Sequence, residues 1–348
     1  MAILNFPSNP SVDETYEENG VLYVWDGQKW TANTSANFLP LTGGTLTGDL
    51  TVPNLVSQGD VQTTSLNDGP LAGFRNQLIN GDFRIWQRGL QVYSTPLTYT
   101  ADRWKLANAG GSVQRSLING DYALQCNAVT EIVQVVEISN YGTGSLPAPF
   151  LDGSTWTFSC VSTAQPTLVN FSWVDYAATA SSLNAGINIV ITDLGEVVPG
   201  ANKYQYTFQV TNASSITATT NGFQVGLVLP SGTTITQMQL EPGPVATPFE
   251  RRPIGAELQL CQRYYQIFFG GVTIAGATSG SVYTFATPYI VPIRPTIPII
   301  SYANTGYANA SGITTATVGN YGVNTEYTAT NNGWAGVLYT DIIADAEL

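Results

Sequence analysis

The alternation of apolar and polar residues predicts short β-strands over most of the chain. Runs with this alternation occupy 154–162, 167–176, 187–193, 204–211 and 222–230. In the second run, Val169, Phe171 and Trp173 fall on one face of a strand with polar residues between them, as expected for a strand with one buried face. Turn-forming residues separate the runs at intervals typical of an all-β sandwich. We therefore predict a jelly-roll β-sandwich for residues 71–250.

One stretch has the apolar spacing of a helix instead. Steps of four, three and four residues, which define one face of a helix, separate Ile254, Leu258, Cys261 and Tyr265. Pro253 suits the first turn of a helix, because its missing amide hydrogen is not needed there. The sequence therefore predicts a connecting helix in residues 251–269.

Two small β regions are predicted at the ends of the chain. Residues 1–35 contain apolar strands next to Asn-Gly and Asp-Gly, which are strong turn signals. Residues 270–348 have strand-like runs that prolines interrupt, and proline cannot donate a hydrogen bond to a sheet. We predict an N-terminal small β unit and a small C-terminal β-sandwich, so the fold class is mainly β.

The segment that follows the first unit differs in composition. Residues 36–70 are rich in glycine and threonine, with apolar residues at wide intervals, among them Leu41, Leu46 and Leu50. One chain of this kind has no core of its own. The segment is either a flexible linker or a neck that is stable only where several chains wind together.

Charge and composition limit the partners that the chain is expected to bind. Its formal net charge is −12, and no Lys or Arg lies between Arg115 and Lys203, so we expect no nucleic-acid partner. No apolar run is long enough to cross a bilayer, so we expect no membrane insertion. The 3 cysteines match no metal-binding spacing and are expected to be buried thiols. We predict no cofactor and assign no metal site. A calcium ion bound by carboxylate and carbonyl oxygens in the jelly roll stays an open alternative, although no Asp-x-Asp-x-Asp loop supports it.

The chain contains 0 histidines, which narrows the catalytic possibilities. Ser-His-Asp catalysis, Cys-His catalysis and zinc sites with histidine ligands are excluded. A pair of carboxylates of the glycosidase type stays open, because the chain has 24 acidic residues. We expect no enzyme activity, and a carboxylate-pair polysaccharide depolymerase is the less favoured alternative.

Several motifs resemble segments of bacteriophage tail fibre proteins. Leu41–Leu50 (LTGGTLTGDL) resembles a segment that recurs in these fibres. Asn76–Gly89 (NQLINGDFRIWQRG) and Thr100–Lys105 (TADRWK) resemble the opening of their jelly-roll modules, which are similar to carbohydrate-binding modules. Met238–Tyr265 resembles the segment that closes this module, and the final Asp-Ala-Glu-Leu resembles a tail fibre ending. The N-terminal NGVLYVWDGQKW is similar to short units of phage structural proteins, including those of phages that infect cyanobacteria.

The resemblance implies a homotrimeric virion protein that is assembled in the host cytoplasm. Its N-terminus is expected to attach to a phage tail or baseplate protein, and its distal domains to recognise a bacterial surface glycan without catalysis. A baseplate or fibre-network connector that binds other virion proteins is the alternative, because both functions need an exposed surface.

The resemblance and the sequence pattern together assign three sets of contact residues. Attachment to the tail is assigned to Tyr16, Tyr23, Trp25 and Trp30. The trimer interface is assigned to Leu41, Leu46, Leu50, Ile254, Leu258, Cys261 and Tyr265. Receptor binding is assigned to aromatic residues near turn-rich stretches, where loops expose side chains, namely Tyr307, Tyr327 and Trp334.

Other aromatic and charged residues are predicted to be structural. Tryptophans on or beside the predicted jelly-roll strands are expected in the core, namely Trp86, Trp104, Trp156 and Trp173. A local charge pair at the start of the jelly roll is expected to join Asp82, Arg84 and Arg88 to Asp102 or Arg103. Three arginines lie around the predicted helix, namely Arg251, Arg252 and Arg263. We expect them to pair with acids such as Glu250 and Glu257.

Overall fold

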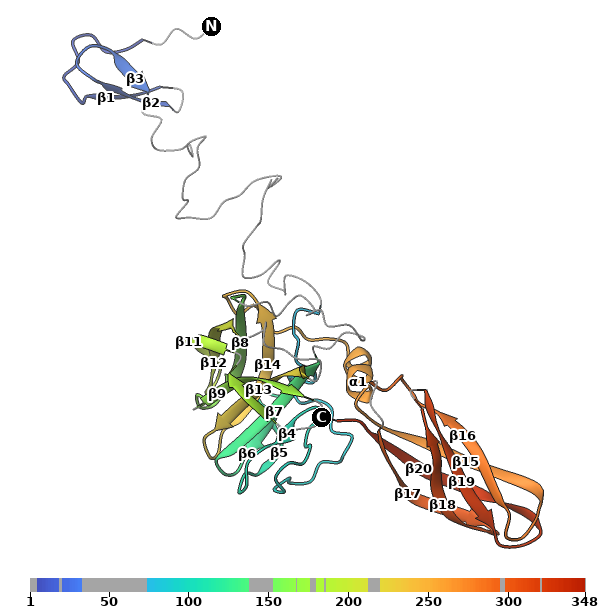
Figure 1. Cartoon of the computed structure of the whole chain (residues 1–348). Coiled ribbons are helices and arrows are strands. Elements are labelled where there is room, and N and C mark those ends of the chain that lie inside the picture. The colour runs from blue at the N-terminus through green and yellow to red at the C-terminus, as the bar shows by residue number, and fades with distance from the viewer. Residues whose placement is uncertain are drawn as a thin grey trace. The chain divides into compact units, whose positions relative to one another are not determined.

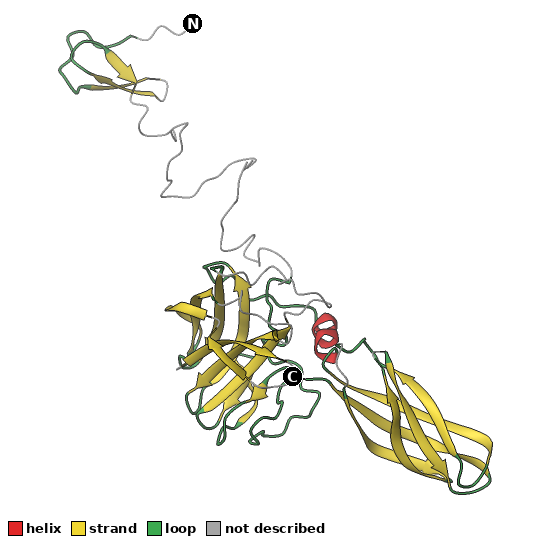
Figure 2. Cartoon of the chain, in the orientation of Figure 1, coloured by secondary structure: helices red, strands yellow, loops and turns green. Residues whose placement is uncertain are grey.

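The computed structural model describes residues 5–18, 21–32, 74–137, 153–166, 168–175, 180–184, 186–211, 220–294, 298–319 and 321–347. The chain divides into two compact units, Met1–Gln62 and Thr63–Leu348, which we call the N-terminal unit and the C-terminal unit (Figure 1). The described residues are mainly β-strand, with α1 (Ile254–Gln262) as their one α-helix (Figure 2). The predicted mainly-β fold with one short helix is confirmed.

The N-terminal unit contains a three-stranded antiparallel sheet in the order β1-β2-β3. Its strands are β1 (Thr15–Glu18), β2 (Val21–Trp25) and β3 (Trp30–Ala32). The turn between β2 and β3 forms where the sequence predicts it, because Asp26 accepts the backbone amides of Gln28 and Lys29 at 2.9 and 2.8 Å. Gly27 adopts a positive φ of 95°, which glycine allows at little cost.

The first part of the C-terminal unit is a sandwich of two antiparallel sheets, which we call the jelly roll. One sheet has the order β10-β9-β13-β7-β4 and the other β11-β12-β8-β14-β6-β5. The strands of the first sheet are β10 (Ala180–Asn184), β9 (Leu168–Asp175), β13 (Thr220–Leu229), β7 (Thr130–Glu137) and β4 (Lys105–Leu106). Those of the second are β11 (Gly186–Val198), β12 (Ala201–Val210), β8 (Thr155–Ser162), β14 (Thr234–Pro242), β6 (Asp121–Cys126) and β5 (Val113–Ile118).

Aromatic side chains fill the core of the jelly roll. Phe171 of β9 stacks on Phe208 of β12 with 3.7 Å between ring centroids, and Phe223 of β13 packs beside both. The inward face of β9 is therefore the one that its alternation predicts. The four tryptophans predicted to be structural are all buried in this core, as expected.

The helix is shorter than the predicted span. Residues 251–269 were assigned to it, but α1 ends at Gln262 and β15 (Tyr265–Ala277) begins three residues later. The prediction is wrong for residues 251–253, which precede the helix, and for residues 263–269. The apolar run from Tyr265 pairs with β20 (Gly333–Asp345), and this pairing overrides the helical spacing.

The predicted helical stripe does not form one face in the structure. Cys261 is 0% exposed and Tyr265 is 7% exposed within one chain, so neither is available to a neighbouring chain and their assignment to a trimer interface is wrong. Ile254 is 54% exposed and Leu258 is half-buried, so these two stay on the surface. Leu41, Leu46, Leu50 and the predicted neck lie outside the described residues.

The second part of the C-terminal unit is the predicted small sandwich, which we call the C-terminal sandwich. It has two three-stranded antiparallel sheets with the orders β15-β20-β17 and β16-β19-β18. The further strands are β17 (Ile299–Ala308), β16 (Val282–Pro288), β19 (Gly322–Ala329) and β18 (Ala310–Val318). Apolar side chains from both sheets, such as Phe268, Val323 and Ile342, pack between them.

Candidate functional site

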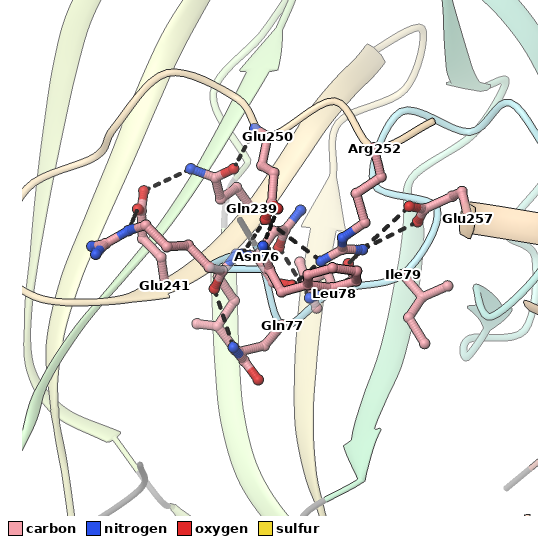
Figure 3. Close-up of polar contacts among 12 residues, drawn as sticks. Asn76, Gln77, Leu78, Ile79, Gln239, Glu241, Glu250, Arg252 and Glu257 are labelled. Carbon is pink, nitrogen blue, oxygen red and sulfur yellow. Dashed lines mark hydrogen bonds and ion pairs between the residues drawn. The ribbon is translucent and has the colours of Figure 1, made fainter. Parts of the chain in front are cut away.

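Arg252, in the motif that precedes the helix, is held in a buried polar network (Figure 3). Its guanidinium donates to the carbonyl oxygens of Leu78, at 3.2 Å, and of Asn76. It also forms ion pairs with Glu250 at 3.7 Å and with Glu257 at 3.2 Å. Two backbone oxygens and two carboxylates therefore surround this guanidinium, so its role is structural.

The two glutamates of this network also bind the start of the jelly roll. Glu250 accepts the backbone amides of Phe74 and Asn76, the second at 2.8 Å. Glu257, on α1, accepts the backbone amide of Asn80. All three amides precede the first strand of the jelly roll, and those of Asn76 and Asn80 are buried, where an unpaired amide would be costly.

The side chain of Asn76 completes the contact between the two ends of the jelly roll. Its amide nitrogen donates to the carbonyl of Met238 at 3.0 Å, and its oxygen accepts the amide of Leu240 at 3.0 Å. The segments 76–89 and 238–265, which we singled out separately in the sequence, are therefore contact partners. Each segment supplies hydrogen-bonding groups that the other needs.

A second charged cluster joins the jelly roll to the last residues of the chain, and we call it the C-terminal clasp. Arg103 forms an ion pair with Glu347, and its guanidinium lies 3.4 Å from the ring centroid of Tyr264. Arg88 pairs with Asp345 at 3.1 Å and lies 3.6 Å from Glu347. The backbone amide of Ala346 donates to the carbonyl of Tyr264 at 2.7 Å. The terminal acidic motif is therefore tied to the jelly roll.

Asp102 lies in the same region and has an altered acidity. It is 0% exposed, and burial raises its pKa to about 6, although hydrogen bonds from Gln87 and the charge of Arg88 act in the opposite direction. The negative charge of Glu347 adds to the increase in pKa. Gln87 also donates to the carbonyl of Tyr265 at 2.9 Å, so it links Asp102 to the C-terminal sandwich.

The expected local charge pair at the start of the jelly roll forms only in part. Asp82 and Arg84 approach to 2.6 Å. Arg88 instead pairs with Asp345, far along the chain, and Asp102 accepts the amide of Gln87 at 2.8 Å. The direct ion pairs of Arg88 are therefore with the chain end, whose carboxylates local spacing does not indicate, while Asp102 interacts with Arg88 only through its charge.

The arginines around the helix pair with acids of the same chain. Arg252 binds Glu250 and Glu257, as predicted. Arg251 pairs with Asp121 at 2.9 Å, and Arg263 pairs with Glu137 at 3.0 Å. These two partners lie on strands of the jelly roll, so the expected pairing with acids is confirmed, and the acids that bind Arg251 and Arg263 are not the two that were named as examples.

The three receptor-binding candidates differ in exposure. Tyr327 is 1% exposed and packs against the ring of Tyr283 in the core of the C-terminal sandwich, so its assignment as a receptor contact is wrong. Trp334 is 50% exposed and Tyr307 is 39% exposed. The hydroxyl oxygen of Tyr307 accepts the backbone amide of Ile313 at 3.3 Å, which fixes the ring on the surface.

Sequence reasoning missed further exposed aromatic residues on the C-terminal sandwich. Tyr321 is 78% exposed, Phe269 is 66% exposed and Tyr339 is 49% exposed. Phe269 was missed because its run was assigned to the helix. Read as a strand, the same run places Phe269 and Phe268 on opposite faces. Tyr339 follows an irregular register in β20, which no local pattern indicates.

The aromatic residues assigned to tail attachment pack on one another in the N-terminal unit. Phe6 stacks on Trp30 at 5.5 Å between centroids and also contacts the rings of Tyr16 and Tyr23 at 5.6 and 5.0 Å. Trp25 packs beside Trp30 at 5.6 Å. All five side chains are half-buried, so the cluster both stabilises this small unit and keeps aromatic surface accessible. Phe6 lies outside the strands, and no periodic signal marks it.

Within the described ranges, no group of three or more acidic or cysteine side chains is placed to hold a metal ion. The three cysteines are free and buried, as predicted. No described helix has the length and apolar character needed to cross a membrane. No protein-family model matches the chain, and no curated protein matches it.

Proposed function

We propose that the chain is a structural virion protein, a trimeric phage tail fibre that recognises a bacterial surface glycan without catalysis. The observation that carries the proposal is the distribution of aromatic side chains in the C-terminal unit. The tryptophans of the jelly roll are buried, whereas the C-terminal sandwich exposes Trp334, Tyr321 and Tyr339. Exposed aromatic faces on a surface with few charges suit the apolar faces of sugar rings.

The charged residues support a structural rather than a catalytic role. Seven arginines of the described ranges form ion pairs within the chain, and the two buried networks lie where segments of the chain meet. In the network of Figure 3, Glu250 and Glu257 accept backbone amides and face Arg252. These carboxylates are buried and hold the fold together, which argues against the depolymerase alternative at this site.

The N-terminal unit supports the attachment part of the proposal. It is compact by itself, and its half-buried aromatic cluster offers a surface for a tail or baseplate protein. The same surface suits a connector between virion proteins. A connector would use both ends of the chain for protein partners, so glycan binding by the C-terminal unit separates the two functions.

The test is adsorption of the purified full chain to bacterial cells and to their extracted polysaccharide. We expect saturable binding with no release of reducing ends, and a trimer by mass photometry. Binding to virion proteins in place of polysaccharide would favour the connector, and release of reducing ends would establish the depolymerase. A monomer would contradict the trimeric fibre.

A further inference from the structure

The jelly roll carries an open depression of about 530 Å³ beside the last residues of the chain. Half-buried and exposed side chains line it together, among them Arg88, Val92, Ser94, Leu97, Tyr99 and Asp345. The volume lies in the range of about 300–1,000 Å³ that small-molecule sites occupy. The lining combines two exposed aliphatic side chains with hydroxyl groups and one partly exposed carboxylate.

The loop that forms one wall of the depression is held in a fixed and strained conformation. Leu97 has a φ of 61°, a left-handed conformation that costs a residue with a side chain about 1–2 kcal/mol. Its backbone amide donates to the carbonyl of Leu106 at 2.8 Å, and the hydroxyl of Thr98 donates to the carbonyl of Thr95 at 2.6 Å. Leu97 is nevertheless 68% exposed, so the strain does not serve to bury its side chain. A ligand that covers Leu97 would account for this arrangement.

The contacts of the Asp345 carboxylate fix its orientation but occupy only part of its hydrogen-bonding capacity. One oxygen accepts from Arg88 at 3.1 Å, and the other accepts the backbone amide of Glu347 at 3.1 Å. The side chain remains 36% exposed. A carboxylate has about four acceptor positions, so Asp345 retains capacity for two hydroxyl donors from a ligand.

The charge around the depression disfavours an anionic ligand. The guanidinium groups of Arg88 and Arg103 face the carboxylates of Asp102, Asp345 and Glu347. The ammonium group of Lys105 lies 5.7 Å from the ring centroid of Tyr99, so three positive groups meet three carboxylates and no positive excess attracts an anion. An additional negative charge would be repelled by Asp345 at the surface. The combination of an available carboxylate, hydroxyl groups and aliphatic surface matches a neutral molecule with several hydroxyl groups.

We propose that this depression binds a neutral saccharide, so that the jelly roll contributes a glycan site besides the aromatic surface of the C-terminal sandwich. Asp345 accepts hydroxyl groups of the sugar, Ser94 adds a hydrogen bond, and Val92 and Leu97 cover an apolar face of the ring. Because Asp345 belongs to the C-terminal clasp, the site is complete only while the chain end is docked. The inference rests on the proposed glycan recognition and locates one of its binding sites.

The experiment compares four proteins on an array of neutral and uronic-acid-containing oligosaccharides. They are the full-length wild type, Ser94→Trp, which fills the depression, Ala109→Trp, and Leu117→Ala at an exposed residue of β5 that does not line the depression. Ser94 and Ala109 are both exposed loop residues of the jelly roll, so Ala109→Trp is the matched control for adding a tryptophan to the surface. Thermal unfolding of each variant checks that the fold is retained.

We expect the wild type to bind at least one neutral oligosaccharide, and Ser94→Trp to bind it at least tenfold more weakly. Ala109→Trp and Leu117→Ala are expected to bind that oligosaccharide as the wild type does. Wild-type affinity in Ser94→Trp, or binding confined to uronic acids, would overturn the site while leaving glycan recognition intact. No binding of the wild type to any oligosaccharide or to bacterial cells would overturn the proposed function together with the site.

Discussion

Arg103 and Glu347 form an ion pair that is almost fully shielded from solvent, although 244 residues separate them in the sequence. Arg103 comes from the loop before β4, and Glu347 follows the last strand. Their side chains are 1% and 2% exposed. The chain end is therefore part of the packing of the jelly roll, and the C-terminal sandwich is joined to it through both its first and its last strand.

Removing the charge of Glu347 is expected to destabilise the C-terminal unit strongly. The substitution Glu347→Gln keeps the shape of the side chain but leaves the buried guanidinium of Arg103 without its carboxylate partner. Loss of one partner of a buried pair costs about 3–5 kcal/mol in the free energy of unfolding. Urea unfolding followed by tryptophan fluorescence measures this loss.

Asp121→Asn is the matched control for that substitution. Asp121 also pairs with an arginine, Arg251, but their side chains are 42% and 45% exposed. We expect a change below about 1 kcal/mol, because solvent screens exposed ion pairs. Equal effects of the two substitutions would show that the C-terminal clasp is not a buried ion pair in solution.

The neighbouring arginines 251 and 252 provide a second comparison. Arg252→Lys is expected to lose about 3 kcal/mol in the free energy of unfolding, because an ammonium group cannot reach two carboxylates and two backbone oxygens at once. Arg251→Lys is expected to change it by less than about 0.5 kcal/mol, since Arg251 is exposed. The same denaturation measurement applies. If both lysine variants unfolded alike, the network of Figure 3 would not be structural.

The strands and the core could be read from the sequence where alternation is strict. The run 167–176 alternates cleanly, and Phe171 and Trp173 of β9 are buried as that pattern predicts. Alternation fails where a strand is apolar on both faces. The run from Tyr265 to Phe269 satisfies both helical and strand spacing, and its pairing with β20, about 75 residues further on, decides between them.

The polar contacts could be predicted only where both partners are close in sequence. The pairing of Arg252 with Glu250 and Glu257 is local and was expected. The partners of Arg88 and Arg103 lie at the chain end, and no spacing rule connects positions so far apart. The burial of Tyr327 was missed because Thr325, a polar residue, occupies the inward position of β19 between Val323 and Tyr327 and so interrupts the apolar alternation.

The stability of the chain is expected to depend on pH through Asp102. Its pKa in the folded chain, about 6, lies above its ordinary value of 3.8, so the folded state holds the proton more tightly than the unfolded state. The resulting stabilisation is complete below about pH 4 and is lost as the pH rises through 6. The loss amounts to about 3 kcal/mol.

Thermal unfolding at pH values from 4 to 7 tests this dependence. The Asp102→Asn variant lacks the ionisable group, so the wild type should lose stability relative to it across this range. Asp121→Asn, at an exposed site, should follow the wild type instead. A constant difference between the wild type and Asp102→Asn at all pH values would contradict the raised pKa.

Substitutions at Trp334 and at Tyr327 are expected to affect receptor binding and stability differently. Tyr327→Ala removes a side chain that is 1% exposed, and the cavity left in the C-terminal sandwich should cost about 3–5 kcal/mol in the free energy of unfolding. Trp334→Ala removes a half-exposed ring and should cost less than about 1 kcal/mol. If the aromatic surface contacts the receptor, Trp334→Ala weakens adsorption to host cells at least fivefold without a change in unfolding.

The comparison of Trp334→Ala with Tyr327→Ala needs a control substitution at an exposed residue outside the C-terminal sandwich. Leu117→Ala serves as this control, because Leu117 is a 57% exposed apolar residue of β5 in the jelly roll. Its adsorption and unfolding should match those of the wild type. Two results together would mean that Trp334 is not a receptor contact. Tyr327→Ala would reduce adsorption only to the extent that it unfolds the protein, and Trp334→Ala would leave adsorption unchanged. Binding would then have to be sought on other surfaces, since Tyr327 affects it only by holding the sandwich together.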